Sequence, residues 1–239
     1  MSRALYILGA ALSFWGVARF CRSATDGFTF LKVAEAVSSG GPAQACPELA
    51  GQTFTYLGRG KQCFVFASED GMRVLKLMRK APRNEQERES YRLAFEELRE
   101  ETGLIALHME KTAPIEAILV DKLHIAHRVN LGELGFLVQK RATLVFPMLT
   151  ALMEQGNIAG AKQAVKHLRQ LLENRKAKGI SDCDSNVSKN FGFADGQPIQ
   201  IDVGRFSKAA GEAGFKGEEL TQWIRTHYPV LENRAEEEE

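Results

Sequence analysis

Three short runs of aromatic and β-branched residues follow one another in the first half of the 239-residue chain. Residues 53–58, 63–68 and 72–78 are apolar or alternate between apolar and polar positions, a pattern typical of strands. Asp70-Gly71 separates the second run from the third and favours the tight turn of a hairpin, because both residues tolerate a positive φ. We therefore expect the folded part of the chain to begin as an antiparallel sheet.

A long charged segment comes next. Residues 84–107 predict one helix, because their apolar residues recur at helical spacing: Tyr91, Ala94, Phe95 and Leu98. Residues 115–120 and 134–139 are apolar and predict two further strands. The first half of the chain thus has the predicted order β-β-β-α-β-β.

The second half of the chain is mostly helical by its periodicity. Residues 146–155 and 159–178 each carry a helical apolar stripe, and residues 218–225 predict one more helix. A short hairpin with its turn at Asp195-Gly196 separates the second and third of these helices. Strands followed by helices indicate an α+β fold.

Composition excludes several classes of protein. A hydrophobic content of 44% argues against both wholesale disorder and a polytopic membrane protein. The formal net charge of +1 provides no broad positive field, so we expect no nucleic-acid partner. The four cysteines form no CxxC pair and have no histidine at metal-ligand spacing, which argues against a zinc site or a disulfide framework.

An apolar segment opens the chain. Residues 4–17 are almost entirely apolar, with Arg3 before them and Arg19 after them. This length is closer to a signal-peptide core than to a membrane crossing of about 20 residues, and a cut after Ala18 would follow small residues. The alternative is an uncleaved anchor whose arginines reach the headgroups. The segment 1–22 therefore predicts an exported or membrane-anchored protein, associated with the membrane through its N-terminus if the segment is not cleaved.

Two features of the predicted sheet suit a phosphate ligand. Gly58 and Gly60 lie in the turn between the first two strands, where backbone amides can approach a phosphate without a Cβ in the way. Lys76 lies in the third strand among apolar residues, and a buried ammonium requires a partner. Glu97 and Glu101, one turn apart on the predicted helix, can supply it. The alternatives are a plain tight turn and a lysine that extends to solvent.

Acidic and amide residues gather in a later loop. Asp182, Asp184 and Asn190 follow the long second-half helix, and Asp202 closes an apolar strand just before a glycine. A carboxylate and an amide oxygen placed in this way can share a metal ion. Taken separately, these residues also fit a solvated turn and an ordinary strand end. Their occurrence together, after the glycine turn and the strand lysine, favours a site for a metal and a phosphate.

In this order the segments resemble the protein-kinase-like superfamily, and in particular a divergent bacterial group of signal-bearing kinase-like proteins. The resemblance covers about residues 53–206, with Asp202-Val203-Gly204 in the place of the family's Asp-Phe-Gly. It implies an α+β, two-lobe fold with an antiparallel five-stranded N-lobe, one long helix and a reduced, mostly helical C-lobe. The implied boundaries are 1–22 for the signal peptide or anchor, 23–50 for a linker, 51–143 for the N-lobe, 144–229 for the C-lobe and 230–239 for an acidic tail.

The resemblance also implies a site for Mg²⁺ and ATP in a cleft between the lobes. The residues that it assigns to the nucleotide are Gly58, Gly60, Lys61, Cys63, Val65, Lys76, Glu97, Glu101, Gln139 and Arg141. It assigns the metal to Asn190 and Asp202, and the catalytic role to Asp184 or Asp182. Lys76 would be held by one of the two glutamates, and Gln139 to Arg141 would form the hinge that faces the adenine.

The sequence also departs from the kinase pattern. The His-Arg-Asp signature is absent, and Ser185 stands where the catalytic aspartate would precede Asn190 by five positions. Only 33 residues follow Phe206, so we expect the chain to lack the usual substrate-binding helices. The resemblance therefore leaves open a phosphotransferase acting on a small molecule or a dedicated protein partner, and a pseudokinase-like binding or scaffold module. A purely structural envelope protein is a more distant alternative.

Two cysteines supply a smaller hypothesis. The resemblance places Cys63 and Cys183 on opposite walls of the nucleotide cleft, where they could form a disulfide in an exported protein. The alternative is that both are small space-filling residues.

Overall fold

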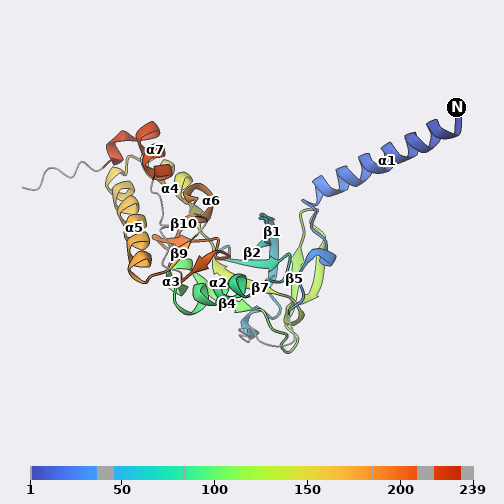
Figure 1. Cartoon of the computed structure of the whole chain (residues 1–239), viewed down its shortest axis with the longest axis horizontal. Helices are drawn as coiled ribbons and strands as arrows, with labels where there is room; N and C mark the ends of the chain where they lie inside the picture. Colours follow the sequence, from blue (N-terminus) through green and yellow to red (C-terminus); the bar gives the residue numbers. More distant parts are fainter. Residues whose placement is uncertain are drawn as a thin grey trace, which may run out of the picture. The chain divides into compact units, whose positions relative to one another are not determined.

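A computed structural model describes residues 2–36, 46–82, 84–182, 184, 186–208 and 218–232, with the backbone alone for residues 2–6 and 9–11 (Figure 1). The chain forms two compact units, one from Met1–Ala81 and Ala106–Val138 and the other from Pro82–Ile105 and Gln139–Glu239. Both units contain helices and strands. The α+β class predicted from the sequence is therefore confirmed.

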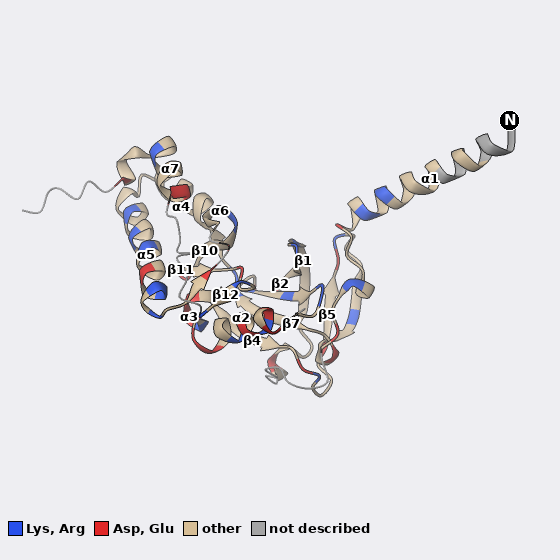
Figure 2. Ribbon diagram, viewed as in Figure 1, with Lys and Arg blue, Asp and Glu red and all other residues tan. Residues whose placement is uncertain are grey.

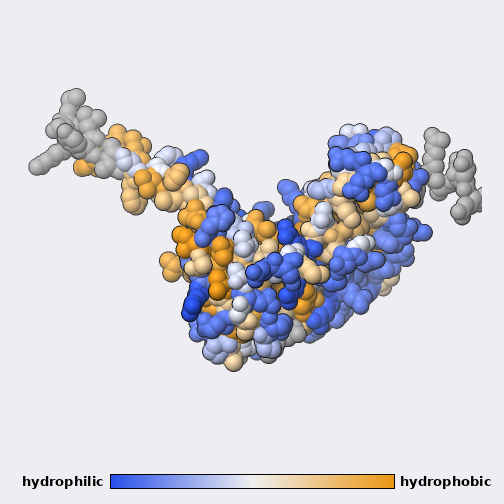
Figure 3. All heavy atoms as spheres, turned by 180° about the vertical axis from the view of Figure 1, so that it is seen from behind, coloured by the Kyte–Doolittle hydropathy of each residue, from blue (hydrophilic) through white to orange (hydrophobic). Residues whose placement is uncertain are grey.

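The apolar N-terminal segment forms helix α1, Ser2–Ala24. Its described apolar side chains are largely exposed, among them Phe14 and Phe20 at more than 70% (Figure 3). The Arg19 guanidinium lies 5.4 Å from the centre of the Trp15 ring. Among the described residues, no helix combines the length and the apolar composition that crossing a membrane requires. Export or anchoring through this segment stays a prediction.

A seven-stranded sheet dominates the first unit, in the order β4-β7-β3-β2-β1-β5-β6. Its strands are β1 Thr53–Arg59, β2 Cys63–Ser68, β3 Arg73–Met78, β4 Leu104–His108, β5 Glu116–Val120, β6 Ala126–Asn130 and β7 Phe136–Lys140. The ends of β4 and β7 continue along the chain into the second unit. All five predicted strands are present, and the Asp70-Gly71 hairpin joins β2 to β3 as expected.

The prediction of an antiparallel, five-stranded sheet was wrong in two respects. Strand β1 runs parallel to β5, and β4 and β6 bring the number of strands to seven. Strand β6 pairs with β5 at the edge of the sheet and is mostly polar, with Val129 as its one buried residue. An edge strand that buries so little leaves no clear alternation in the sequence.

The segment predicted as a linker, residues 23–50, contributes to the core of the first unit. Phe28 is buried and packs edge-on against Phe64 and Phe66, with ring centres 5.0 and 5.4 Å away. Two short 3-10 helices, Phe30–Lys32 and Pro47–Leu49, lie in the same segment. Its middle part, residues 37–45, lies outside the described residues. The sequence did not predict this packing, because the apolar residues of the segment are isolated and follow neither the strand nor the helix period.

The second unit contains the helices α2 Glu85–Glu96, α3 Arg99–Thr102, α4 Val145–Glu154, α5 Ile158–Ala177, α6 Val187–Asn190 and α7 Glu218–His227. Its strands β8 Thr143–Leu144, β10 Phe191–Ala194 and β11 Gln197–Gln200 form one small sheet, and β9 Ser181–Asp182 pairs with β12 Phe206–Ser207. Apolar side chains from α4, α5, α7 and β10 form its core, including Leu149, Leu168, Phe191 and Ile224. The predicted helices and hairpin of this half are confirmed.

The long helix predicted over residues 84–107 does not exist as one element. It starts as predicted, with Asn84 Oδ1 accepting from the Glu87 amide at 2.9 Å, but α2 ends at Glu96 and only the short α3 follows. Gly103 then closes α3 in the left-handed conformation (φ +62), and the remaining residues form β4. The Glu-rich composition concealed this break, because glutamate favours helix at every position.

A buried histidine makes the stability of the first unit depend on pH. His108 is fully buried, its Nδ1 donates to the Leu134 carbonyl at 2.9 Å, and its ring stacks on Phe136. Because a carbonyl only accepts, Nδ1 carries a proton, and Nε2 lies 3.0 Å from the Thr112 hydroxyl. Burial lowers the pKa of His108 below its usual value of 6.5.

We predict that the free energy of unfolding falls as the pH drops below about 6.5. In this range His108 binds a proton more readily in the unfolded chain than in the folded protein, where its pKa is lowered. In His108→Gln this part of the acid sensitivity disappears, although the variant is less stable than the wild type at pH 7.5 through lost packing. Urea unfolding at pH 7.5 and pH 5.5 measures both effects. His227→Gln, at an exposed position, is the control and should keep the wild-type pH dependence. Equal acid sensitivity in His108→Gln and the wild type would contradict the prediction.

Candidate functional site

The glycine turn of the first unit is a closed hairpin turn. The Gly60 amide donates to the Cys63 carbonyl at 2.8 Å. Arg79 holds the turn from the end of β3: its Nη1 donates to the carbonyls of Gly60 and Lys61 at 3.1 and 3.3 Å. A Cβ on Gly58 would meet nothing within 4 Å, so packing does not explain a glycine at that position. Space remains over this backbone for a ligand.

The strand register brings three of the predicted residues into one row. Gly58 of β1 lies opposite Val65 of β2, which in turn lies opposite Lys76 of β3. Directly opposite residues share one face of a sheet, so the three lie on the same face. Phe64 and Leu77, on the other face, are fully buried, whereas Val65 and Lys76 are only half-buried. The register therefore brings Gly58 and Lys76 onto one face of this sheet, and their binding of a phosphate stays a prediction.

In the second unit, the predicted catalytic and metal-binding residues share a hydrogen-bonded loop. Asp182 Oδ1 accepts from the Asp184 amide at 2.9 Å, and Asn190 Nδ2 donates to the Asp184 carbonyl at 2.7 Å. The Asn190 carbonyl accepts from the Ile201 amide at 2.7 Å, which connects the loop to the segment that carries Asp202. Strands β9 and β12 close the loop, with Asp182 opposite Phe206.

Burial changes the acidity of the Asp182 carboxyl. Its side chain is nearly enclosed, and this burial raises the pKa of its carboxyl above the usual 3.8. Hydrogen bonds from the Asp184 amide and from Gln200 Nε2, together with the charge of Arg175, partly oppose that increase, whereas the charge of Asp202 adds to it. A carboxyl with a raised pKa holds a proton more readily, which suits general acid–base chemistry.

The other two carboxylates of the loop are more open to solvent. Asp184 pairs with Arg205 at 3.5 Å, and the Asp202 side chain is exposed. Within the described ranges, no group of three or more His, Cys, Asp or Glu residues is arranged to hold a metal ion. The predicted magnesium pair, Asn190 and Asp202, combines one amide with one carboxylate and stays a prediction. Cys183 and Ser185 lie outside the described residues, and with them the hypothetical disulfide to Cys63.

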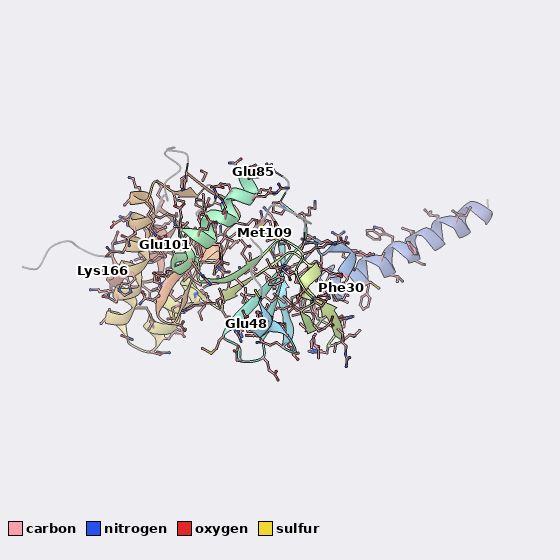
Figure 4. The ribbon with its side chains drawn as sticks, turned by 90° about the horizontal axis from the view of Figure 1, so that it is seen from below. Phe30, Glu48, Glu85, Glu101, Met109 and Lys166 are labelled. Carbon is pink, nitrogen blue, oxygen red and sulfur yellow. The ribbon has the colours of Figure 1, made fainter. Side chains whose placement is uncertain are left out.

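The predicted glutamates occupy different elements. Glu97 follows α2 and pairs with Lys208 at 2.5 Å. Glu101, labelled in Figure 4, lies on α3 beside α5 and pairs with Arg175 at 3.2 Å and with Lys178 at 2.6 Å. The expectation that both stand one turn apart on a single helix was therefore wrong, because the helix breaks between α2 and α3. A pairing of either glutamate with Lys76 stays a prediction.

The predicted hinge residues divide between the interior and the surface. Gln139 is fully buried, and its Nε2 donates to the carbonyls of Thr102 and Gln200, the latter at 3.1 Å. Arg141 is exposed. Gln139 therefore connects β7 to α3 and β11 with its side chain, a role that its place after an apolar strand did not indicate.

Sequence reasoning missed three buried polar residues near the acidic loop. They are Ser90, Arg175 and Gln200, each at most 3% exposed. A signal for Arg175 existed: it continues the stripe of Leu168 and Leu171 on α5 at helical spacing, so its position predicts burial. Gln200 lies between two isoleucines in a strand and gave no such signal.

A cavity of about 790 Å³ opens elsewhere in the second unit. Its walls come from α3, α5 and the β10–β11 hairpin, and the acidic residues of α3 are visible in Figure 2. Among the predicted site residues Glu101 lines it, and Asp182, Asp184, Asn190 and Asp202 do not. The cavity is therefore separate from the acidic loop.

No family model matches the sequence, and no curated protein matches it.

A buried hydroxyl fixes the segment that carries Asp202. Ser90 Oγ, on α2, donates to the Val203 carbonyl and accepts from the Phe206 amide, both at 2.7 Å. The side chain is 1% exposed, so water cannot replace it at either group. Ser90 therefore connects the segment after Asp202 to α2 through two hydrogen bonds.

We predict that Ser90→Ala lowers the free energy of unfolding by about 1–3 kcal/mol, because it leaves a buried carbonyl and a buried amide without partners. Urea unfolding measures this loss. Thr226→Ala is the matched control: it removes an exposed hydroxyl that bonds one turn back on α7, and it should stay within about 0.5 kcal/mol of the wild type. A loss as small as that of the control would show that Ser90 does not hold the segment.

Proposed function

We propose that the chain is a kinase-like protein that binds Mg²⁺ and ATP and transfers phosphate to a small molecule or a dedicated protein partner. The observation that carries this proposal is the bond from Asn190 Nδ2 to the Asp184 carbonyl. It fixes the amide so that Oδ1, the end able to bind a cation, points away from Asp184. An amide oxygen and a nearby carboxylate such as Asp202 are ligands that suit Mg²⁺.

The sheet of the first unit supports the phosphate-binding part of the proposal. The row from Gly58 to Lys76 combines a glycine that has open space above it with an ammonium on the same face. Lys61, at the tip of the turn, is exposed and adds a second positive charge. In phosphoryl transfer such groups act by positioning and by neutralising charge, so little covalent chemistry is asked of the protein.

The loop geometry favours Asp184 over Asp182 as the general base. Both oxygens of Asp182 accept hydrogen bonds, one from the Asp184 amide in the loop and one from Gln200 Nε2 on β11. The Asp184 carboxylate is half-buried and pairs with Arg205 on its exposed side. Asp182 thus orients the loop, and Asp184 is the carboxylate better placed to accept a proton from a substrate hydroxyl.

The second candidate is a pseudokinase-like binding or scaffold module. The ion pair between Asp184 and Arg205 favours it, because the guanidinium occupies the carboxylate that a substrate hydroxyl would have to approach. The absence of the His-Arg-Asp signature points the same way. In this function the nucleotide binds without turnover.

We predict that Mg²⁺ and ATP together raise the melting temperature of the wild-type protein. A ligand at 100 times its Kd adds about 2.7 kcal/mol, which amounts to several degrees. The stabilisation should be lost in Lys76→Ala, and Asp202→Asn should remove the part that requires Mg²⁺. Lys80→Ala and Asp195→Asn, both at exposed positions, are the matched controls and should respond like the wild type. No stabilisation by millimolar ATP would overturn both nucleotide-binding functions.

A second prediction separates catalysis from binding alone. If the chain is a phosphotransferase, Asp184→Asn lowers the rate of ATP turnover by about 100-fold or more, the contribution of a general base, with nucleotide binding retained. Release of ADP under saturating Mg²⁺ and ATP is the measurement, and Glu218→Gln on α7 is the control. Binding without turnover in the wild type would establish the pseudokinase-like function. An unchanged rate in Asp184→Asn would show that another group accepts the proton.

A further inference from the structure

A buried arginine lies behind the acidic loop in the second unit. Arg175 projects from α5 and is 3% exposed. Its Nε donates to Glu101 Oε2 at 3.2 Å, its Nη1 donates to Gln200 Oε1, and its guanidinium lies 4.9 Å from the centre of the Phe206 ring. Helices α3 and α5 and strands β11 and β12 therefore meet at one cation.

This cation determines which way the Gln200 amide points. A guanidinium has donors and no acceptor, so the amide oxygen of Gln200 must face Arg175. The amide nitrogen then faces the opposite direction, where it donates to Asp182 Oδ2 at 2.5 Å and to the Asp202 carbonyl at 2.9 Å. Gln200 is fully buried, so no water competes for either end.

We propose that Arg175 and Gln200 are positioning residues for the candidate site: Arg175 fixes the polarity of the Gln200 amide, and Gln200 holds Asp182 and the backbone of Asp202 at a set separation. The role of these two residues in catalysis rests on the proposed function. The orientation of the Gln200 amide between Arg175 and Asp182 does not rest on it. The Gln200 amide thereby connects Asp182, which orients the loop that carries Asp184, to the backbone of Asp202.

Stability alone gives a weak reason for this arrangement. Burying an ion pair such as Arg175 with Glu101 is often neutral or worse in comparison with apolar packing. Moreover, Arg175 Nη2 is buried without a hydrogen-bond partner among the described residues, which adds a cost of desolvation. The hydrogen bonds of Arg175 and Gln200 are directional and lead to Asp182 and Asp202, two residues of the candidate site. Such an arrangement fits a positioning role better than a role in stability alone.

The polarity can be tested by reversing it. In Gln200→Glu a carboxylate faces Asp182 Oδ2. In Asp182→Asn the new amide nitrogen opposes either Gln200 Nε2 or the Asp184 amide, because both donate to this side chain. In the double variant the introduced amide nitrogen can donate to the introduced carboxylate, which still accepts from Arg175. The contact with the Asp202 carbonyl alone is not restored.

We expect each single variant to lower the urea midpoint of unfolding, and the double variant to recover at least half of the loss of the worse single variant. Additive losses would overturn the proposed polarity. A second measurement uses the side-chain NH₂ signals of Gln200, identified by their absence in Gln200→Glu. Their hydrogen exchange should be slow in the wild type and at least about tenfold faster in Arg175→Met. Equal exchange in both would show that Arg175 does not hold the amide.

The catalytic consequence is measured separately. Arg175→Lys keeps the charge but loses the forked geometry, so kcat should fall by about tenfold or more while KM for ATP stays within about twofold. A kcat within about twofold of the wild type would overturn the positioning role. If the wild type neither binds nor turns over Mg²⁺ and ATP, the proposed function fails, and the urea and exchange measurements still decide whether Arg175 and Gln200 set the polarity of the loop.

Discussion

The second unit depends on one buried positive charge. The guanidinium of Arg175 cannot lose its proton in the interior, so its N–H groups need acceptors from the residues around it. Glu101 and Gln200 do so from α3 and β11. This requirement places a short helix, a long helix and a hairpin strand in fixed relation, and it passes a defined polarity on to Asp182. Apolar packing around Phe191 and Leu168 supplies most of the burial, but it is not directional.

In the first unit, the strand register performs the corresponding task. Because the pairing of β1 with β2 shifts between Tyr56 and Gly58, Gly58 lies in one row with Val65 and Lys76, and one face of the sheet presents a glycine and a lysine together. A slip of one residue would send Lys76 to the face where Phe28 packs. The aromatic core of this unit therefore fixes the register, and the register gathers the groups suited to phosphate.

Sequence patterns predicted most of the regular elements, because alternation and helical stripes are imposed directly by burial on one side. They failed where burial is slight, as in the polar edge strand β6, and where a single residue ends an element, as Gly103 does. The acidic loop was predicted as a set of residues. The hydrogen bonds that organise this loop were not predicted. Ser90 bonds to Val203, 113 positions later in the chain, and Gln200 bonds back to Asp182, 18 positions earlier. Such bonds leave no periodic trace in a sequence.

The packing of Phe28 has a consequence for maturation of the N-terminus. Proteolysis after Ala18 would remove most of α1 but would leave Phe28 and Val33 attached to the sheet, with their side chains still enclosed. The short stretch between the cut and Phe28 would then remain at the N-terminus of the mature protein. Removal of Phe28 by further proteolysis would instead expose the rings of Phe64 and Phe66. The resulting apolar surface would promote aggregation.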